Sequence, residues 1–107
     1  MTTQLLTDLQ ATRALIARPE QWTTGRYARN SDGLEVAFNA DEATCFCLEG
    51  AVMRVAGGDS SANDRYRHIV RAIEAVRPTY IAFNDTHTHA EVLELLDRII
   101  SAEARNQ

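Results

Sequence analysis

A group of polar side chains stands out in the stretch Thr79–His89, which reads TYIAFNDTHTH. It consists of Asn84, Asp85, His87 and His89. Imidazoles and carboxylates are ligand types for a transition metal, and a helix that begins here would direct backbone N–H groups toward an anion. We expect a ligand-binding site here, provided that Trp22 and Arg26 converge with this group on one pocket. The alternative is that the same groups cap a helix and bond within a loop.

Metal binding and catalysis find little support in the spacing of these residues. His87-x-His89 does not match the H-E-x-x-H pattern of zinc enzymes, and the sequence holds no phosphate loop or dinucleotide fingerprint. A nucleophile would be Cys45 or Cys47, which we expect one turn or more inside a buried helix, where thiols are inert. A grouping of Cys47 with a histidine of the polar stretch would require the fold to close the gap between them. We therefore predict no catalytic residue, no metal site and no cofactor.

The positions of these groups depend on the most apolar run of the chain, Ala43–Gly57 (ATCFCLEGAVMRVAG). On a helix its apolar side chains lie almost all the way round, which predicts a central, buried helix. Asn39 or Asp41 would cap its start, and Gly57 would end it. Gly50 lies inside the run, where glycine costs about 1 kcal/mol relative to alanine. It indicates a close neighbour, either another helix or Trp22, or a ligand lying against the backbone.

Three further helices follow from apolar periodicity and capping residues. Thr2 or Thr3 is a plausible N-cap for the first, Asn63 for the second, and Thr88-x-x-Glu91 forms a capping box for the third. Prolines close the first two. The three helices are expected at residues 3–18, 63–77 and 88–100, with a frayed tail over 101–107.

Short β elements are expected in two places. Two alternating runs flank the turn residues Asn30–Gly33, which predicts a hairpin over 26–38, with an irregular loop as the competing interpretation. Residues 79–83 have the composition of a strand and could pair with 34–38. The predicted fold is mainly α, a four-helix single domain over residues 1–107 around a central buried helix, with a small β element. A pure helical bundle is the nearest alternative.

Composition restricts the classes of partner. The 107 residues carry a net charge of −4, which disfavours nucleic acid and anionic membranes. Two cysteines that cannot pair with each other on one helix fit a reducing cytoplasm. The N-terminal sequence has no basic region followed by an apolar one, so no secretory signal is predicted, and no stretch is long enough to span a membrane.

Four short elements, taken in order, resemble a known family. They read Trp22-Thr-Thr-Gly25, Cys47-Leu-Glu-Gly-Ala51, Phe83-Asn-Asp85 and Glu91-Val-Leu-Glu-Leu-Leu-Asp97. With this order and spacing, residues 5–102 resemble a small family of bacterial and phage-associated proteins that is catalogued only as a domain of unknown function. The resemblance implies a bacterial or phage origin and brings no activity with it.

Two functional hypotheses remain. The first is a non-catalytic cytoplasmic interaction or regulatory module that binds another protein or its own copy. An exposed apolar patch would support it. The second is a small-molecule- or metal-binding protein, with enzymatic activity left open, whose site lies near Asn84–His89.

Overall fold

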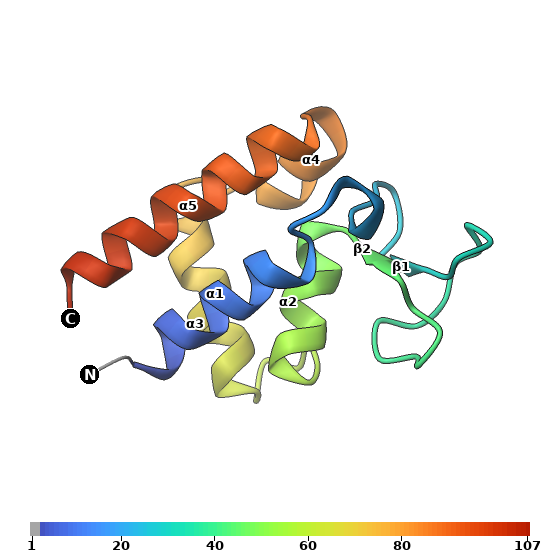
Figure 1. The fold of residues 1–107 in the computed structure, drawn as a ribbon. Helices are drawn as coiled ribbons and strands as arrows, with labels where there is room; N and C mark the ends of the chain where they lie inside the picture. Colours follow the sequence, from blue (N-terminus) through green and yellow to red (C-terminus); the bar gives the residue numbers. More distant parts are fainter. Residues whose placement is uncertain (1–2) are drawn as a thin grey trace.

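A computed structural model describes residues 3–107 of the chain (Figure 1). The described part is mainly helical, as predicted, with five α-helices, one 3₁₀ turn and a two-stranded antiparallel sheet. In chain order the elements are α1 (Gln4–Leu15), η1 (Pro19–Gln21), β1 (Ala28–Arg29), β2 (Cys45–Phe46), α2 (Leu48–Ala56), α3 (Asp64–Glu74), α4 (Tyr80–Thr86) and α5 (His89–Arg105). No helix within residues 3–107 is both long and apolar enough to cross a membrane.

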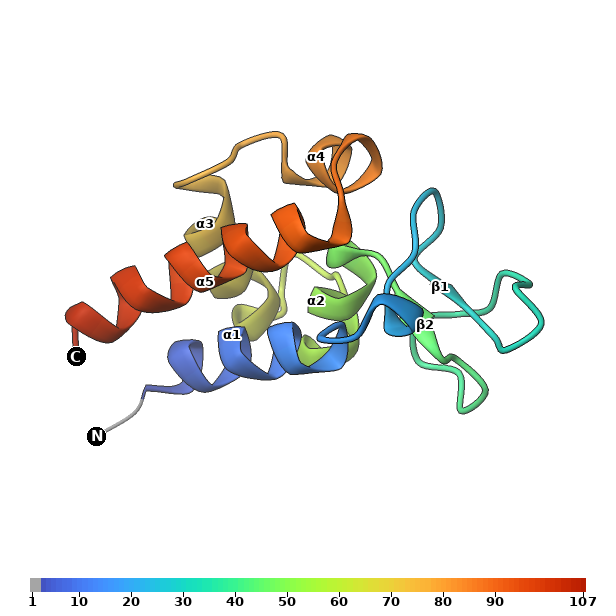
Figure 2. The ribbon, with the colours of Figure 1, turned by 45° about the horizontal axis from the view of Figure 1, so that its top comes forward.

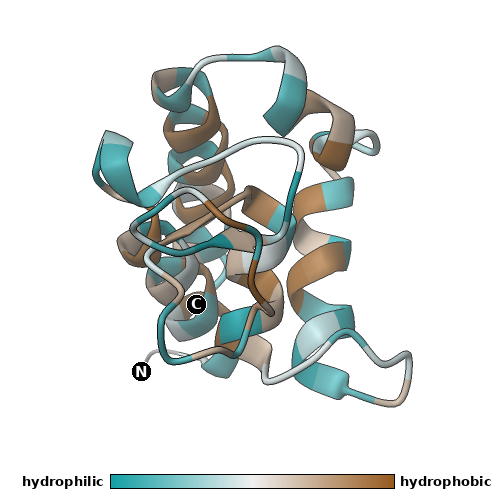
Figure 3. Ribbon diagram, turned by 90° about the vertical axis from the view of Figure 1, so that its right-hand side faces the viewer, coloured by the Kyte–Doolittle hydropathy of each residue, from teal (hydrophilic) through white to brown (hydrophobic). Residues whose placement is uncertain are grey.

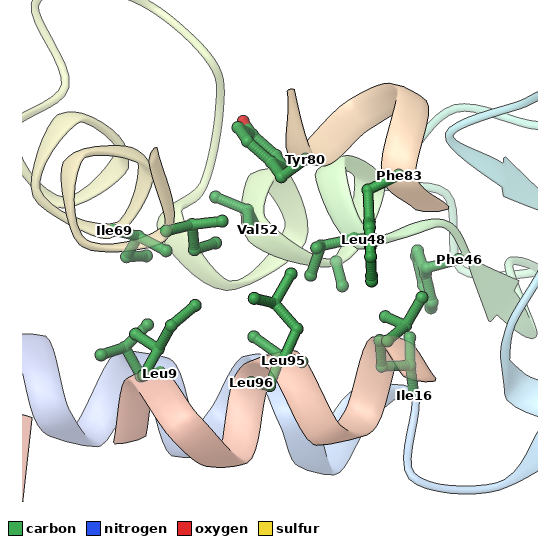
Figure 4. Packing of buried hydrophobic residues seen from close by; sticks show 14 of the residues in the cluster. Leu9, Ile16, Phe46, Leu48, Val52, Ile69, Tyr80, Phe83, Leu95 and Leu96 are labelled. Carbon is green, nitrogen blue, oxygen red and sulfur yellow. The ribbon is translucent and has the colours of Figure 1, made fainter. Parts of the chain in front are cut away.

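The helices α1, α2, α3 and α5 enclose one hydrophobic core. Helices α1 and α5 run antiparallel side by side, and α2 packs against α1, α3 and α4 (Figure 2). Side chains from all five helices meet between them (Figure 4). The fully buried ones include Leu9, Ile16, Leu48, Val52, Ile69, Ile73, Val92 and Leu96. Helix α2 is thus central and buried, as the sequence predicts.

Local capping signals define the starts of three helices, as predicted, whereas α1 and α3 end at Leu15 and Glu74, three residues before the predicted ends. The Thr3 side chain accepts a hydrogen bond from the Leu6 amide, and the Asn63 side chain accepts one from the Tyr66 amide. Thr88 and Glu91 form the predicted capping box. Each of these bonds satisfies a backbone N–H that has no partner within its own helix.

The predicted start of the central helix is wrong. Residues 43–47 are not helical: Cys45 and Phe46 form β2, and α2 begins at Leu48 with Cys47 as its N-cap, in place of Asn39 or Asp41. The backbone of this segment bonds to β1, with Ala28 opposite Phe46. Sequence periodicity could not reveal this, because a short apolar run fits a buried strand as well as a buried helix. The predicted end is confirmed, since Gly57 has a φ of +84° at the C-cap.

The predicted β elements are partly confirmed. The turn in 26–38 is present: the Asn30 side chain accepts from the amides of Asp32 and Leu34, and Arg29 forms a bridge with Glu35. The regular partner of β1 is β2, however, and not residues 34–38.

The strand predicted for residues 79–83 is wrong, because this segment begins helix α4. Tyr80, Phe83 and Asn84 lie three and four positions apart and are all buried, so a helix presents them together to the core. Also contrary to expectation, α5 continues through most of the predicted tail, to Arg105.

Candidate functional site

Asn84 joins three separate segments at the end of the molecule that carries β1 and β2. It is 1% exposed, and its Oδ1 accepts from the indole Nε1 of Trp22 (2.7 Å) and the amide of Leu48 (3.0 Å). Its Nδ2 donates to the carbonyl of Thr23 (3.2 Å) and to Asp85 (3.1 Å). All four hydrogen bonds that a carboxamide can form are therefore made. Asn84 ties the loop after η1 to the first turn of α2.

Asp85 lies beside this network and is exposed. Its Oδ1 accepts from the Gly25 amide (3.1 Å) and from Asn84. Within residues 3–107, no donor reaches its Oδ2. The carboxylate is thus fixed in orientation through one oxygen, while the other is available to a ligand.

A pocket of about 300 Å³ opens between the loop, α2 and α4. Its walls come from chain segments that are far apart in sequence. The lining residues are Gly25, Arg26, Tyr27, Glu35, Cys47, Glu49, Ile81, Asn84 and Asp85. Three of them are carboxylates and one is an arginine, so the charged side chains of the lining are mainly acidic.

Glu49 forms part of the inner wall, and sequence reasoning missed it. It is 5% exposed and accepts hydrogen bonds from the hydroxyls of Tyr66 (2.6 Å) and Tyr80 (2.5 Å). Burial, followed by the hydrogen bond to Glu49, raises the pKa of both tyrosines, so both remain proton donors. The sequence does contain a signal for it: Glu49 is a carboxylate inside the most apolar run of the chain. A charge that is buried requires partners, so this position points to a polar contact in the core.

Cys47 is placed differently from the prediction. It is at the N-terminus of α2 and not inside the helix, and its Sγ accepts from the Gly50 amide (3.2 Å). The side chain is buried, and burial raises the pKa of its thiol. A raised pKa disfavours the thiolate, which is the reactive form. Capping of α2 explains this cysteine better than nucleophilic catalysis.

Of the six residues predicted to bind a ligand, three line this pocket: Arg26, Asn84 and Asp85. Arg26 pairs with Glu35 at 3.3 Å, with both side chains exposed. Trp22 reaches Asn84 through its indole N–H without lining the pocket.

The two histidines lie elsewhere. His87 stacks on Phe83 with ring centroids 3.8 Å apart, and its Nδ1 lies 3.0 Å from the carbonyl oxygen of Phe83. The Nε2 of His89 lies 2.7 Å from the carbonyl oxygen of Ile16. The predicted six-residue convergence is therefore incomplete. Within residues 3–107, no group of three His, Cys, Asp or Glu side chains is arranged to hold a metal ion. This arrangement does not favour the small-molecule or metal-binding hypothesis.

Gly50 lies against the backbone of Tyr27, which lines the pocket. A Cβ on Gly50 would lie 1.9 Å from the carbonyl oxygen of Tyr27 and 2.7 Å from its carbonyl carbon. The same oxygen accepts from the Cys47 amide at 3.2 Å. The predicted close approach is confirmed, but the neighbour is the backbone of Tyr27 and not a helix or Trp22. This contact holds Tyr27 against the first turn of α2.

Comparisons with known proteins identify a family but no activity. A family model described as a family of unknown function (DUF6197) matches residues 1–102. No curated protein and no solved structure matches the chain.

Proposed function

The chain belongs to DUF6197, a family of unknown function, and from its surface we propose that it is a non-catalytic module that binds another protein. The observation that carries this proposal is the pair of apolar side chains beside the pocket. Tyr27 is 49% exposed and Ile81 is 52% exposed, although both are large and line the same pocket. Aromatic and apolar side chains of this kind supply the buried centre of protein interfaces.

The form of the pocket favours a protein partner over a small molecule. Its volume of about 300 Å³ is at the lower end of the range for small-molecule sites, about 300–1,000 Å³. Six of its lining residues are exposed: Gly25, Arg26, Tyr27, Glu35, Ile81 and Asp85. The loop that supplies Tyr27 also exposes Leu34 (63%). A surface of this kind can cover a segment of a partner rather than enclose a whole ligand.

Other parts of the proposal come from the sequence. A cytoplasmic location is supported by the two free cysteines, and a bacterial or phage-associated origin by the resemblance of the four short elements. The net charge of −4 supports a protein partner over nucleic acid. Self-association through the same surface remains part of the proposal.

The test is a selection of peptides from a random library displayed on phage, with the purified protein as bait. We expect a recurring peptide motif, whose binding is then measured by isothermal titration calorimetry. Replacing Ile81 by aspartate puts a charge on the apolar surface, so it should weaken binding at least about tenfold. Val76→Asp is the matched control, because Val76 is an exposed apolar residue that does not line this pocket.

Two results would contradict the proposal. One is a selection that returns no recurring motif. The other is a set of peptides that bind the Ile81→Asp protein as tightly as the parent. Circular dichroism of both variants would establish that they are folded.

A further inference from the structure

The available carboxylate and the apolar side chains of the pocket indicate the kind of group that it would bind. Resting on the proposed function, we propose that it receives an arginine side chain of the partner protein. The guanidinium would meet the Oδ2 of Asp85, and the aliphatic part of the side chain would lie between Tyr27 and Ile81.

The charged side chains of the pocket leave one carboxylate available to a ligand. The pocket is lined by Glu35, Glu49 and Asp85 against the single arginine Arg26. Glu35 already pairs with Arg26, and both oxygens of Glu49 are occupied by tyrosine hydroxyls. The carboxylate of Asp85 remains, which a cationic ligand would complement.

Asp85 is held in place before any ligand arrives. Its Oδ1 is fixed by the Gly25 amide and by Asn84, and Asn84 is itself fully hydrogen-bonded. Binding then does not have to order this carboxylate, which reduces the entropic cost of association. A rigid acceptor of this kind is better suited to recognition than a mobile surface carboxylate.

The pocket combines apolar walls with one available acceptor. An arginine side chain has an aliphatic stem that packs on apolar surface and a planar head that stacks on aromatic rings. Ile81 and Tyr27 provide these two kinds of surface beside the pocket. The chain itself contains such a contact at another site, where the guanidinium of Arg77 lies 4.5 Å from the centroid of the Phe83 ring. A lysine would satisfy the charge but would not stack as a plane.

The experiment uses peptides from the selection described above. We expect the motif to contain an arginine, and we expect its replacement by citrulline, which is neutral but nearly the same shape, to weaken binding at least about tenfold. Asp85→Asn should weaken binding of the arginine peptide by a similar factor, because it removes the charge and keeps the shape. The same variant should have little effect on the citrulline peptide, since the two groups act as a pair.

The matched control is Asp64→Asn, which removes an exposed carboxylate in the first turn of α3, outside the pocket. It should leave the affinity for the arginine peptide unchanged. N-acetylarginine methylamide, the residue without a peptide around it, should bind far more weakly than the peptide.

The outcomes separate this inference from the proposed function. Peptides that bind through Ile81 but lack arginine, or that bind the Asp85→Asn protein as the parent, overturn the inference and leave the proposed function standing. Failure of the selection contradicts both. If N-acetylarginine methylamide binds as tightly as the peptide, the pocket is a small-molecule site and the partner protein is ruled out.

Discussion

The two ends of the molecule are stabilised by different means. Around α1, α3 and α5, apolar side chains from successive turns fill the core (Figure 4). At the other end, residues 22–47 contain only four residues of regular strand (Figure 1). In Figure 3, which faces this end, hydrophilic colours prevail in the irregular segments. Hydrogen bonds, one close backbone contact and a small number of apolar side chains hold them to the helices.

The polar contacts at the pocket end come from few side chains with several partners each. Arg54 of α2 donates to the carbonyls of Phe38 (3.0 Å) and Ala40 (2.9 Å). Arg29 donates to the hydroxyl of Thr23 and the carbonyl of Thr24. With Asn84, these residues supplement the apolar contacts through which Ala28 and Phe46 join the core. The positions of the helices therefore depend mainly on the apolar core, whereas the shape of the pocket depends largely on a few polar side chains.

The largest effect is expected from Gly50→Ala, which acts where the two ends meet. The new Cβ would collide with the backbone of Tyr27, which cannot rotate away as a side chain can. We expect a loss of about 3 kcal/mol in the free energy of unfolding, at the upper end for overpacking. Urea denaturation followed by circular dichroism measures it.

Gly33→Ala is the control for this substitution. A Cβ on Gly33 meets nothing within 4 Å, and only its φ of +80° is unfavourable, so the expected cost is about 1 kcal/mol. If the Gly50→Ala protein is as stable as the parent, the close contact with Tyr27 does not restrict the side chain at residue 50.

A smaller and more localised effect is expected from Asn84→Ala. It leaves the indole N–H of Trp22 and the amide of Leu48 without their acceptor, which should cost about 2 kcal/mol. Hydrogen exchange should increase in residues 22–47 more than in α1 and α5, because the core keeps its own packing. The core substitution Leu96→Ala is the comparison and should raise exchange throughout. A uniform increase for Asn84→Ala would mean that the two ends unfold as one unit.

The smallest expected effect is on the stability of the folded protein at alkaline pH. In the folded chain burial, together with the hydrogen bonds to Glu49, raises the pKa of Tyr66 and Tyr80, whereas in the unfolded chain tyrosines ionise near pH 10. The stabilising contribution is therefore complete below about pH 10 and is lost as the pH rises above it.

Tyr80→Phe removes one of the two phenols and should make this alkaline loss of stability less steep. Urea denaturation of both proteins between about pH 8 and about pH 11 tests this. An equally steep decline in the variant would show that Tyr80 is not protected from ionisation by the fold.

The sequence predicted those features that depend on neighbouring residues. Thr3, Asn63 and Thr88 cap their helices because a capping bond spans only three residues. Asn84 and Asp85 are candidate site residues in the sequence because they belong to a polar group just before a helix N-terminus, and both line the pocket. The ligand-binding role of these two, and of the other four candidates, stays a prediction.

The features that the sequence did not reveal depend on distant partners. Cys45 and Phe46 form a strand because β1, sixteen or more residues away, pairs with them. Glu49 is buried because Tyr66 and Tyr80 come from two other helices. The neighbour of Gly50 lies 23 residues earlier, at Tyr27. No periodicity within one element contains this information.

The indole of Trp22 gives the pocket end its own spectroscopic signal. It is the only tryptophan in the chain, and it lies in the Asn84 network, with its ring centroid 5.5 Å from that of His89. Intrinsic fluorescence therefore reports on this one region, without labelling, while the helices are followed by their ellipticity. A change in fluorescence at a lower temperature than the loss of ellipticity would show that the pocket end opens before the helices melt.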